Sequence, residues 1–193
     1  FGSSLKLCSN WLHTCTNLKN PNCLAFNLSA PFIMEFFSTQ LEEVYPYVDI
    51  VFCNDSEARM YAMMKEWSMD LTVEQIAGRL ANNDRRNLDR PRIVIVTQDL
   101  NPVLMTRSKT PELKGPENWS SIEFPVQKLE KEEIVDTNGA GDSFAGGFLA
   151  QLALNEFNLD LDSLRRCCAA GNYCAREIIK QNGCTIPDKK ANY

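Results

Sequence analysis

The chain has 193 residues, of which 44% are hydrophobic and 23% are charged. This composition favours a folded globular protein with a sizeable core and argues against disorder. The formal net charge is −5 without any basic block, so neither nucleic acid nor an acidic membrane surface is an expected partner. No apolar run approaches the length of a membrane span, and the first residues lack the layout of a signal peptide.

The first half of the chain alternates strand and helix patterns. Short apolar runs predict strands that are buried on both faces of a parallel sheet. These runs lie at 24–26, 49–52 and 93–96. Stretches with the length and periodicity of crossover helices lie between them, and a polar segment at 82–90 precedes the third strand. We expect these helices at 32–45, 56–67 and 72–81.

The second half continues this alternation. Strands are expected at 103–106 and 122–126, on either side of a surface loop that contains the Pro and Gly residues of 111–116. Two long helices follow at 141–157 and 161–181. The alternation predicts an α/β fold class with a mainly parallel sheet, in which ligands bind at the carboxyl ends of the strands.

The run from Asp136 to Asp142, with the sequence DTNGAGD, is the most informative stretch of the chain. Gly139 and Gly141 permit a tight turn in which backbone N–H groups converge. Apolar residues at four-residue spacing from Phe144 onward indicate that an amphipathic helix begins directly afterwards. The N–H groups of the turn and the positive end of that helix would together hold a phosphate oxygen.

Asp142 lies at the mouth of this turn. There, a carboxylate can accept the proton of an attacking hydroxyl while the amides stabilise charge on the transferring group. The alternative is an Asp that only caps a helix after a glycine turn.

The complete string at 136–148 resembles the signature of the ribokinase-like (PfkB) family of carbohydrate and nucleoside kinases. Further segments resemble the branch of that family that phosphorylates adenosine; they lie at 27–32, 46–50, 54–58, 97–98 and 183–185. The resemblance covers the whole chain. It implies a ribokinase-like three-layer α/β/α fold with a mainly parallel sheet, present as one partial domain over 1–193. The family's amino-terminal part, with its lid and ribose-gripping residues, has no counterpart here.

The resemblance implies an ATP-dependent transferase that phosphorylates the 5′-hydroxyl of adenosine and yields AMP and ADP, a reaction of purine salvage. Asp142 would be the general base, and the amides of Asn138, Gly139, Ala140 and Gly141 would form the anion hole. Mg²⁺ would be required, and a monovalent cation could bind near Asp136. The complete protein would be a monomer of the cytoplasm and nucleus. Two alternatives stay open: a ribokinase-like kinase for another sugar or nucleoside, and a catalytically inactive nucleotide-binding fragment.

Asn54 and Glu57 follow a predicted strand and open a helix. They match the family's N-x-x-E motif, which implies that they position magnesium and phosphate, often through water. Magnesium prefers such oxygen ligands and usually keeps several waters. The alternative is an ordinary helix start, with Asn54 as cap and Glu57 as its reciprocal partner.

Four further residues are implied to line the ligand sites. Thr97 and Gln98 would lie beside ATP, although the next residue is Asp99 where the family usually has Gly. Asn172 would contact the adenine of ATP, and Phe32 would line the nucleoside base pocket. The alternatives are a strand-end turn for Thr97 and Gln98, helix packing around Asn172 and a core position for Phe32.

The eight cysteines contain no CxxC pair, and one histidine, His13, offers little partnership for a metal. We therefore expect reduced structural thiols, as in cytosolic proteins. The cysteines are Cys8, Cys15, Cys23, Cys53, Cys167, Cys168, Cys174 and Cys184.

Overall fold

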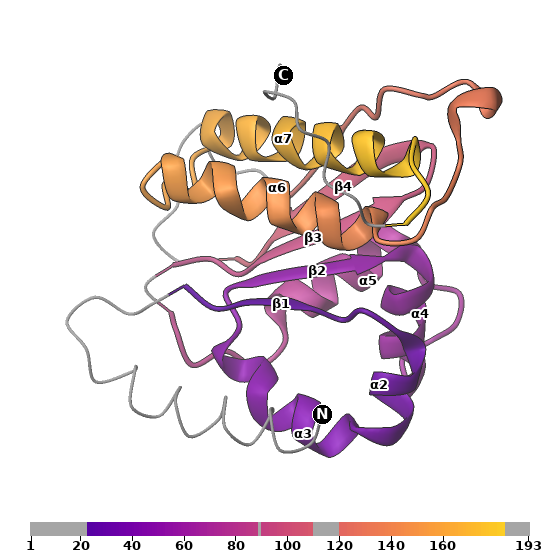
Figure 1. Cartoon of the computed structure of the whole chain (residues 1–193). Coiled ribbons are helices and arrows are strands. Elements are labelled where there is room, and N and C mark those ends of the chain that lie inside the picture. Colours follow the sequence, from indigo (N-terminus) through magenta and orange to yellow (C-terminus); the bar gives the residue numbers. More distant parts are fainter. Residues whose placement is uncertain (1–22, 89, 110–119, 184–193) are drawn as a thin grey trace. The chain divides into compact units, whose positions relative to one another are not determined.

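A computed structural model describes residues 23–88, 90–109 and 120–183 (Figure 1). The chain divides into two compact units. The first unit comprises residues 1–97 and 104–122, and the second comprises residues 98–103 and 123–193. The predicted loop at 111–116 lies outside the described residues, as do Cys8, His13, Cys15 and Cys184.

Five strands form one open sheet in the order β1-β2-β3-β4-β5. The first three strands are parallel, and Asn54 at the end of β2 lies opposite Thr97 near the end of β3. Only two residues connect β3 to its neighbour β4, so β4 runs antiparallel to β3. The predicted mainly parallel sheet is therefore confirmed. The strands are β1 Ala25–Asn27, β2 Ile50–Asn54, β3 Ile93–Gln98, β4 Asn101–Arg107 and β5 Ser121–Phe124.

The central strands are the most buried. The first four residues of both β2 and β3 are buried, and most are β-branched or aromatic, as expected for strands covered on both faces. β1 at the sheet edge is only half-buried. Burial of side chains on both faces is why these segments read as continuous apolar runs in the sequence.

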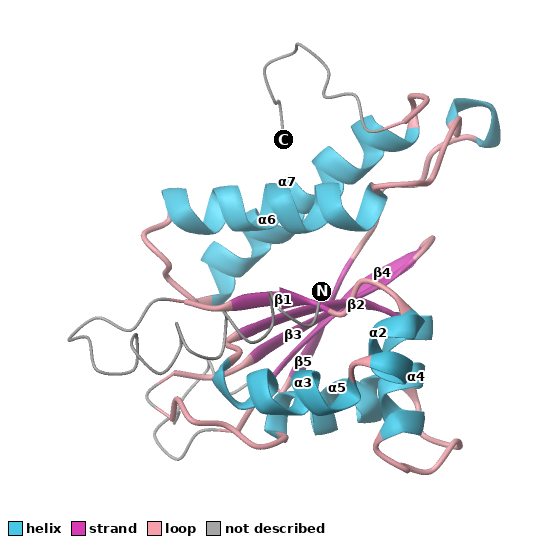
Figure 2. Ribbon diagram, turned by 60° about the horizontal axis from the view of Figure 1, so that its bottom comes forward, coloured by secondary structure: helices cyan, strands magenta, loops and turns pink. Residues whose placement is uncertain are grey.

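The helices of the first unit lie on one face of the sheet (Figure 2). The sequence predicts one helix at 32–45, but the backbone leaves the helical region at Phe37, with φ −129° and ψ 26°. This break lets buried residues of both pieces join the same core, among them Ile33 and Leu41. The elements are α2 Pro31–Phe36, α3 Ser38–Val44, the 3-10 helix η1 Tyr45–Tyr47, α4 Asp55–Met64 and α5 Val73–Asn82.

In the second unit, α6 Ala140–Leu154 and α7 Leu161–Ile179 pack side by side after the 3-10 helix η2 Lys131–Glu133 (Figure 1). Glycines allow the close approach of the two helices. A Cβ at Gly147 would lie 2.7 Å from the carbonyl oxygen of Ala170, and one at Gly171 would lie 2.9 Å from that of Phe144. Neither position can therefore accept a side chain without moving α6 away from α7.

A buried arginine, Arg92, joins several backbone segments by hydrogen bonds near the start of β2 and β3. Arg92 is 1% exposed, and its guanidinium lies 4.4 Å above the ring of Tyr45. Burial lowers the pKa of Arg92. Its five N–H donors all reach backbone carbonyls, so the buried cation is fully satisfied. The acceptors are the oxygens of Tyr45, Val48, Leu80, Asn83 and Asp84, at 2.8 to 3.2 Å.

Candidate active site

The glycine turn before α6 has the geometry that an anion site needs. Gly139 takes the left-handed conformation, with φ 77°, and is the N-cap residue of α6. Within the described part of the chain, no side chain caps this helix. The N–H groups of Asn138 and Ala140 donate within the turn, whereas no hydrogen bond of the described residues uses the N–H of Gly139 or Gly141. Those two amides and the helix dipole can serve an anion.

Asp136 anchors the turn to the end of α7. Its Oδ1 accepts the N–H of Asn138 at 2.9 Å, and its Oδ2 accepts the N–H of Gly183 at 3.2 Å. These hydrogen bonds, the one from Asn138 first, lower the pKa of the Asp136 carboxyl. The carbonyl of Ile179 also accepts the N–H groups of Val135 and Asp136. The sequence pattern predicts no such anchor to α7, although an Asp two residues before a turn residue is a signal for the local bond to Asn138.

Asp142 is the third residue of α6, and its side chain is exposed. Gly139 holds the N-cap position, so Asp142 is not the N-cap residue of α6. A carboxylate in the first turn of a helix is stabilised by the helix dipole. Asp142 is thus an accessible carboxylate in the first turn of α6, next to the amides that can receive an anion.

Asn54 and Glu57 form a reciprocal pair at the start of α4. The Oδ1 of Asn54 accepts the N–H of Glu57 at 2.8 Å, while the Oε2 of Glu57 accepts the N–H of Asn54 at 3.0 Å. The side chains also bond directly, from Nδ2 of Asn54 to Oε1 of Glu57 at 3.0 Å. Ser56, which is not among the predicted site residues, donates to the same Oδ1 at 2.7 Å. The capping box is therefore present, and a role in magnesium binding stays a prediction.

The carboxyl ends of β2 and β3 bring Asn54 and Thr97 together in the first unit. Thr97 Oγ1 donates to the carbonyl of Cys53 at 3.4 Å, which ties the two strand ends. Gln98 Nε2 donates to the carbonyl of Pro102 at 2.7 Å across the β3–β4 connection. Asp99, at the family's usual Gly position, has φ 54° and is exposed. That left-handed backbone explains why glycine suits this position.

The two remaining predicted residues differ in exposure. Phe32 is 48% exposed, so the alternative that it is a core residue is wrong. Asn172 is half-buried on α7, next to Gly171, which packs against Phe144. Helix packing therefore accounts for Gly171, and an adenine contact of Asn172 stays a prediction.

Three further findings concern the described residues as a whole. No group of three or more His, Cys, Asp or Glu side chains among them is arranged to bind a metal ion. None of the helices in the described ranges is long and apolar enough to cross a membrane. The five described cysteines are free thiols, and burial raises the pKa of Cys168 to about 12. Cys53, Cys167 and Cys168 are buried, whereas Cys23 and Cys174 are half-buried, and reduced structural thiols stay a prediction.

An open, mainly parallel sheet and a glycine turn that opens a helix place the chain among the ribokinase-like α/β proteins. The ribokinase of Thermotoga maritima shares the fold, with a TM-score of 0.59 at 21% identity over 90% of this chain and 47% of that chain. The model of the pfkB family of carbohydrate kinases matches residues 2–191, and the chain belongs to that family.

Within this family, the chain is similar to adenosine kinases. Adenosine kinase 1 of Arabidopsis thaliana is 37% identical over 88% of this chain and 44% of the relative. The crystal structure of Anopheles gambiae adenosine kinase in complex with P1,P4-di(adenosine-5) tetraphosphate has a TM-score of 0.74 at 39% identity, covering 94% of this chain and 47% of that chain. Adenosine kinase from Schistosoma mansoni in complex with adenosine and AMP has a TM-score of 0.71 at 31% identity, covering 95% and 47%. The chain thus spans about half the length of these relatives.

Proposed function

We propose that this chain is the catalytic, carboxyl-terminal part of an adenosine kinase. It would transfer the γ-phosphoryl group of ATP to the 5′-hydroxyl of adenosine, giving AMP and ADP in purine salvage. One observation carries the proposal: a left-handed Gly139 opens α6 and leaves amides for an anion, with Asp142 in the first turn. Similarity to adenosine kinases at 37–39% identity supports the choice of substrates.

The proposed reaction needs little covalent chemistry from the protein. The 5′ oxygen of adenosine forms a bond to the γ-phosphorus while the bond from that phosphorus to the bridging oxygen of ADP breaks. Asp142 accepts the proton of the hydroxyl. The amides of the turn and the α6 dipole stabilise charge on the transferring group. Rate enhancement would come mainly from positioning and electrostatic stabilisation.

Asn54 and Glu57 would hold Mg²⁺ through its waters. Hydrogen bonds from Asn54 fix both carboxylate oxygens of Glu57, and Mg²⁺ prefers oxygen ligands of this kind and usually keeps several waters. When bound, Mg²⁺ would neutralise charge on the phosphates of ATP. A monovalent cation near Asp136 is a further part of the proposal.

The remaining predicted residues would bind the two substrates. Thr97, Gln98 and Asn172 would line the ATP site, and Phe32, which is 48% exposed, would contact the nucleoside base. We also propose that the complete protein is a monomer and that it is located in the cytoplasm and nucleus. Size-exclusion chromatography and cell fractionation test those two points.

The direct test separates binding from turnover. The 193-residue chain is titrated with ATP by calorimetry, and AMP formation from adenosine is followed with labelled ATP. We expect weak ATP binding and negligible AMP formation, because the relatives are about twice as long and acceptor orientation supplies roughly 7–11 kcal/mol of barrier lowering. Joining the chain to the amino-terminal half of a related adenosine kinase should restore AMP formation. A joined protein that folds and binds ATP, but leaves adenosine unphosphorylated, would refute the proposed function.

A further inference from the structure

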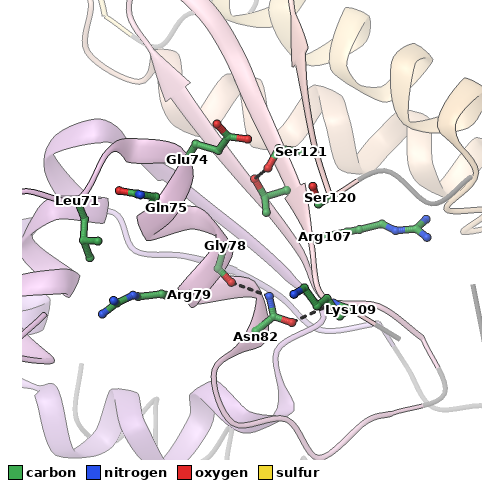
Figure 3. A pocket seen from close by; sticks show the side chains of 11 residues that line it. Leu71, Glu74, Gln75, Gly78, Arg79, Asn82, Arg107, Lys109, Ser120 and Ser121 are labelled. Atoms are coloured by element: carbon green, nitrogen blue, oxygen red, sulfur yellow. Dashed lines mark hydrogen bonds between the residues drawn. The ribbon is translucent and has the colours of Figure 1, made fainter. Parts of the chain in front are cut away.

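A cavity of about 660 Å³ lies in the first unit, between α5 and the strands β4 and β5 (Figure 3). Its volume is in the range of small-molecule pockets. One wall is a face of α5, with Glu74, Gly78 and Asn82. The opposite wall comes from Thr106, Lys109 and Ser121.

The cavity lies near the start of β3, whereas Asn54 and Thr97 lie at the carboxyl ends of β2 and β3. β4 runs antiparallel to β3, so the last residues of β4 lie where β3 begins. Two hydrogen bonds show this placement, from the N–H of Ser108 to the carbonyl of Arg92 and from the N–H of Arg92 to Oγ of Ser108. A strand the length of β3 spans roughly 16 Å. The proposed kinase chemistry therefore does not use this cavity.

Gly78 is an unusual residue for its place in the fold. It lies inside α5, where glycine favours a helix less than alanine does. Its φ lies outside the left-handed range, and a Cβ built on it would meet nothing within 4 Å. Neither backbone conformation nor helix packing requires glycine there. The missing side chain instead leaves open space at the cavity wall.

The end of the cavity at Asn82 carries a positive charge. Asn82 Nδ2 donates to the carbonyl of Gly78 at 2.7 Å, and its Oδ1 accepts the N–H of Lys109 at 3.0 Å, which fixes α5 to the end of β4. Lys109 is exposed at this end. Arg79 points away from the strands, and its guanidinium lies 5.5 Å from the ring of Trp67 (Figure 3). Arg107 also lines the cavity, but its side chain extends away from Gly78 and Asn82 (Figure 3), so Lys109 is the cation beside Asn82.

Two neighbouring features set the charge preference of the cavity. The carbonyls at the carboxyl end of α5 would repel an anion, but Arg92 donates to those of Leu80 and Asn83, at 3.2 and 2.9 Å. Glu74 lies at the other end, eight residues before Asn82, or about 12 Å along the helix. One end therefore favours an anion, and the other end disfavours a second one.

We propose that this cavity binds a small organic anion with a single oxyanion, a carboxylate or a phosphate. The oxyanion pairs with Lys109 beside Asn82. The apolar body of the ligand lies over the backbone of Gly78, and the hydroxyls of Thr106 and Ser121, which bond each other at 3.0 Å, face it. Binding at this cavity does not depend on the proposed kinase function.

Binding to the 193-residue chain is tested with benzoate and phenyl phosphate, with benzyl alcohol as the uncharged control. Amide NMR shifts of Gly78 and Lys109 report the site. We expect saturable shifts with at least one anion, and the stronger one identifies the carboxylate or the phosphate as the preferred group. Benzyl alcohol should bind at least roughly tenfold more weakly, because it cannot form a charge-assisted hydrogen bond with Lys109.

Three variants locate the site. Lys109→Gln should lower affinity roughly tenfold or more. Gly78→Leu should abolish binding by filling the cavity while the chain stays folded, because leucine favours a helix more than glycine does. Lys128→Gln, at an exposed lysine of the second unit, should leave binding unchanged.

The following results would contradict binding of an organic anion in this cavity. No saturable shift with either anion overturns the proposal, and so does equal binding of benzyl alcohol. Unchanged affinity in Gly78→Leu or Lys109→Gln would do the same. A loss in Lys128→Gln as large as that in Lys109→Gln would mean non-specific attraction of anions by lysines.

Discussion

The amino-terminal ends of α4 and α6 both carry predicted site residues, but they are built in opposite ways. At α4, Asn54 and Glu57 cap each other with hydrogen bonds of 2.8 to 3.0 Å. At α6, the cap residue is Gly139, and the N–H groups of Gly139 and Gly141 donate to no group among the described residues. One helix start is saturated by its own side chains, and the other leaves donors for a ligand.

The difference shows where local stability and site chemistry separate. A capping box stabilises a helix without help from any ligand. A glycine turn lacks that stabilisation, but a bound anion can supply the missing hydrogen-bond acceptors. We therefore expect changes at α6 to act mainly on ligand binding and turnover. Changes at α4 should act first on stability.

The largest effect is expected at Asp142. In the joined enzyme, Asp142→Asn should lower turnover by roughly two to four orders of magnitude, the usual scale for a general base. ATP affinity should change little, because the amides of the turn stay in place. Steady-state kinetics beside calorimetric ATP titration measures both quantities. Near wild-type turnover would remove Asp142 from the mechanism.

Gly139→Ala tests the open turn itself. The φ of 77° should cost an alanine about 1–2 kcal/mol, so we expect lower stability and weaker ATP binding. Gly141→Ala is the matched control for folding, since a Cβ there meets nothing within 4 Å and its φ lies outside the left-handed range. Urea unfolding and ATP titration of both variants decide. Equal stability of the two variants would show that the left-handed backbone at position 139 does not require glycine.

Glu57→Ala and Gln75→Ala compare two capping boxes of the same type. Thr72 and Gln75 form the second box at the start of α5. Both variants should lose about 0.5–2 kcal/mol of unfolding free energy. Only Glu57→Ala should also raise the magnesium concentration for half-maximal rate in the joined enzyme. If the two magnesium curves coincide, Glu57 only caps the helix.

The turn before α6 should weaken in acid. The lowered pKa of Asp136 means that its ionised form is favoured in the folded state. Its contribution to stability is therefore complete above the unfolded pKa of about 3.9 and is lost as pH falls through the lower, folded pKa. Amide shifts of Asn138 and Gly183 should follow this titration. In Asp136→Asn these acid-dependent amide shifts should be absent. If they persist in that variant, another group causes them.

The smallest effects are expected where the same two helices end. α4 and α6 both finish with a left-handed glutamate, Glu66 and Glu156, each with φ 54°. The next residues, Trp67 and Phe157, donate back to the carbonyls five residues earlier, both at 2.9 Å. Glycine suits such positions, so Glu66→Gly and Glu156→Gly should each raise the unfolding free energy by about 0.5–1 kcal/mol. Denaturant unfolding measures this, with the matching alanine variants expected to bring no gain.

Local patterns determined most of what the sequence predicts correctly. The apolar runs located β2 and β3, and the glycine turn located the start of α6, because each signal lies within a few neighbouring residues. Helix 32–45 was the exception. Its apolar period continues through Phe37, and the backbone breaks there so that both pieces reach one core.

Contacts between distant residues needed the tertiary structure. Asp136 bonds Gly183 across 47 positions, and Gly147 meets Ala170 on another helix. The cavity beside Gly78 likewise exists only because α5 packs near β4 and β5. A sequence motif specifies which groups are present and their local backbone. Which groups from distant segments meet depends on strand order and helix packing, and these are fixed by the burial of the whole core.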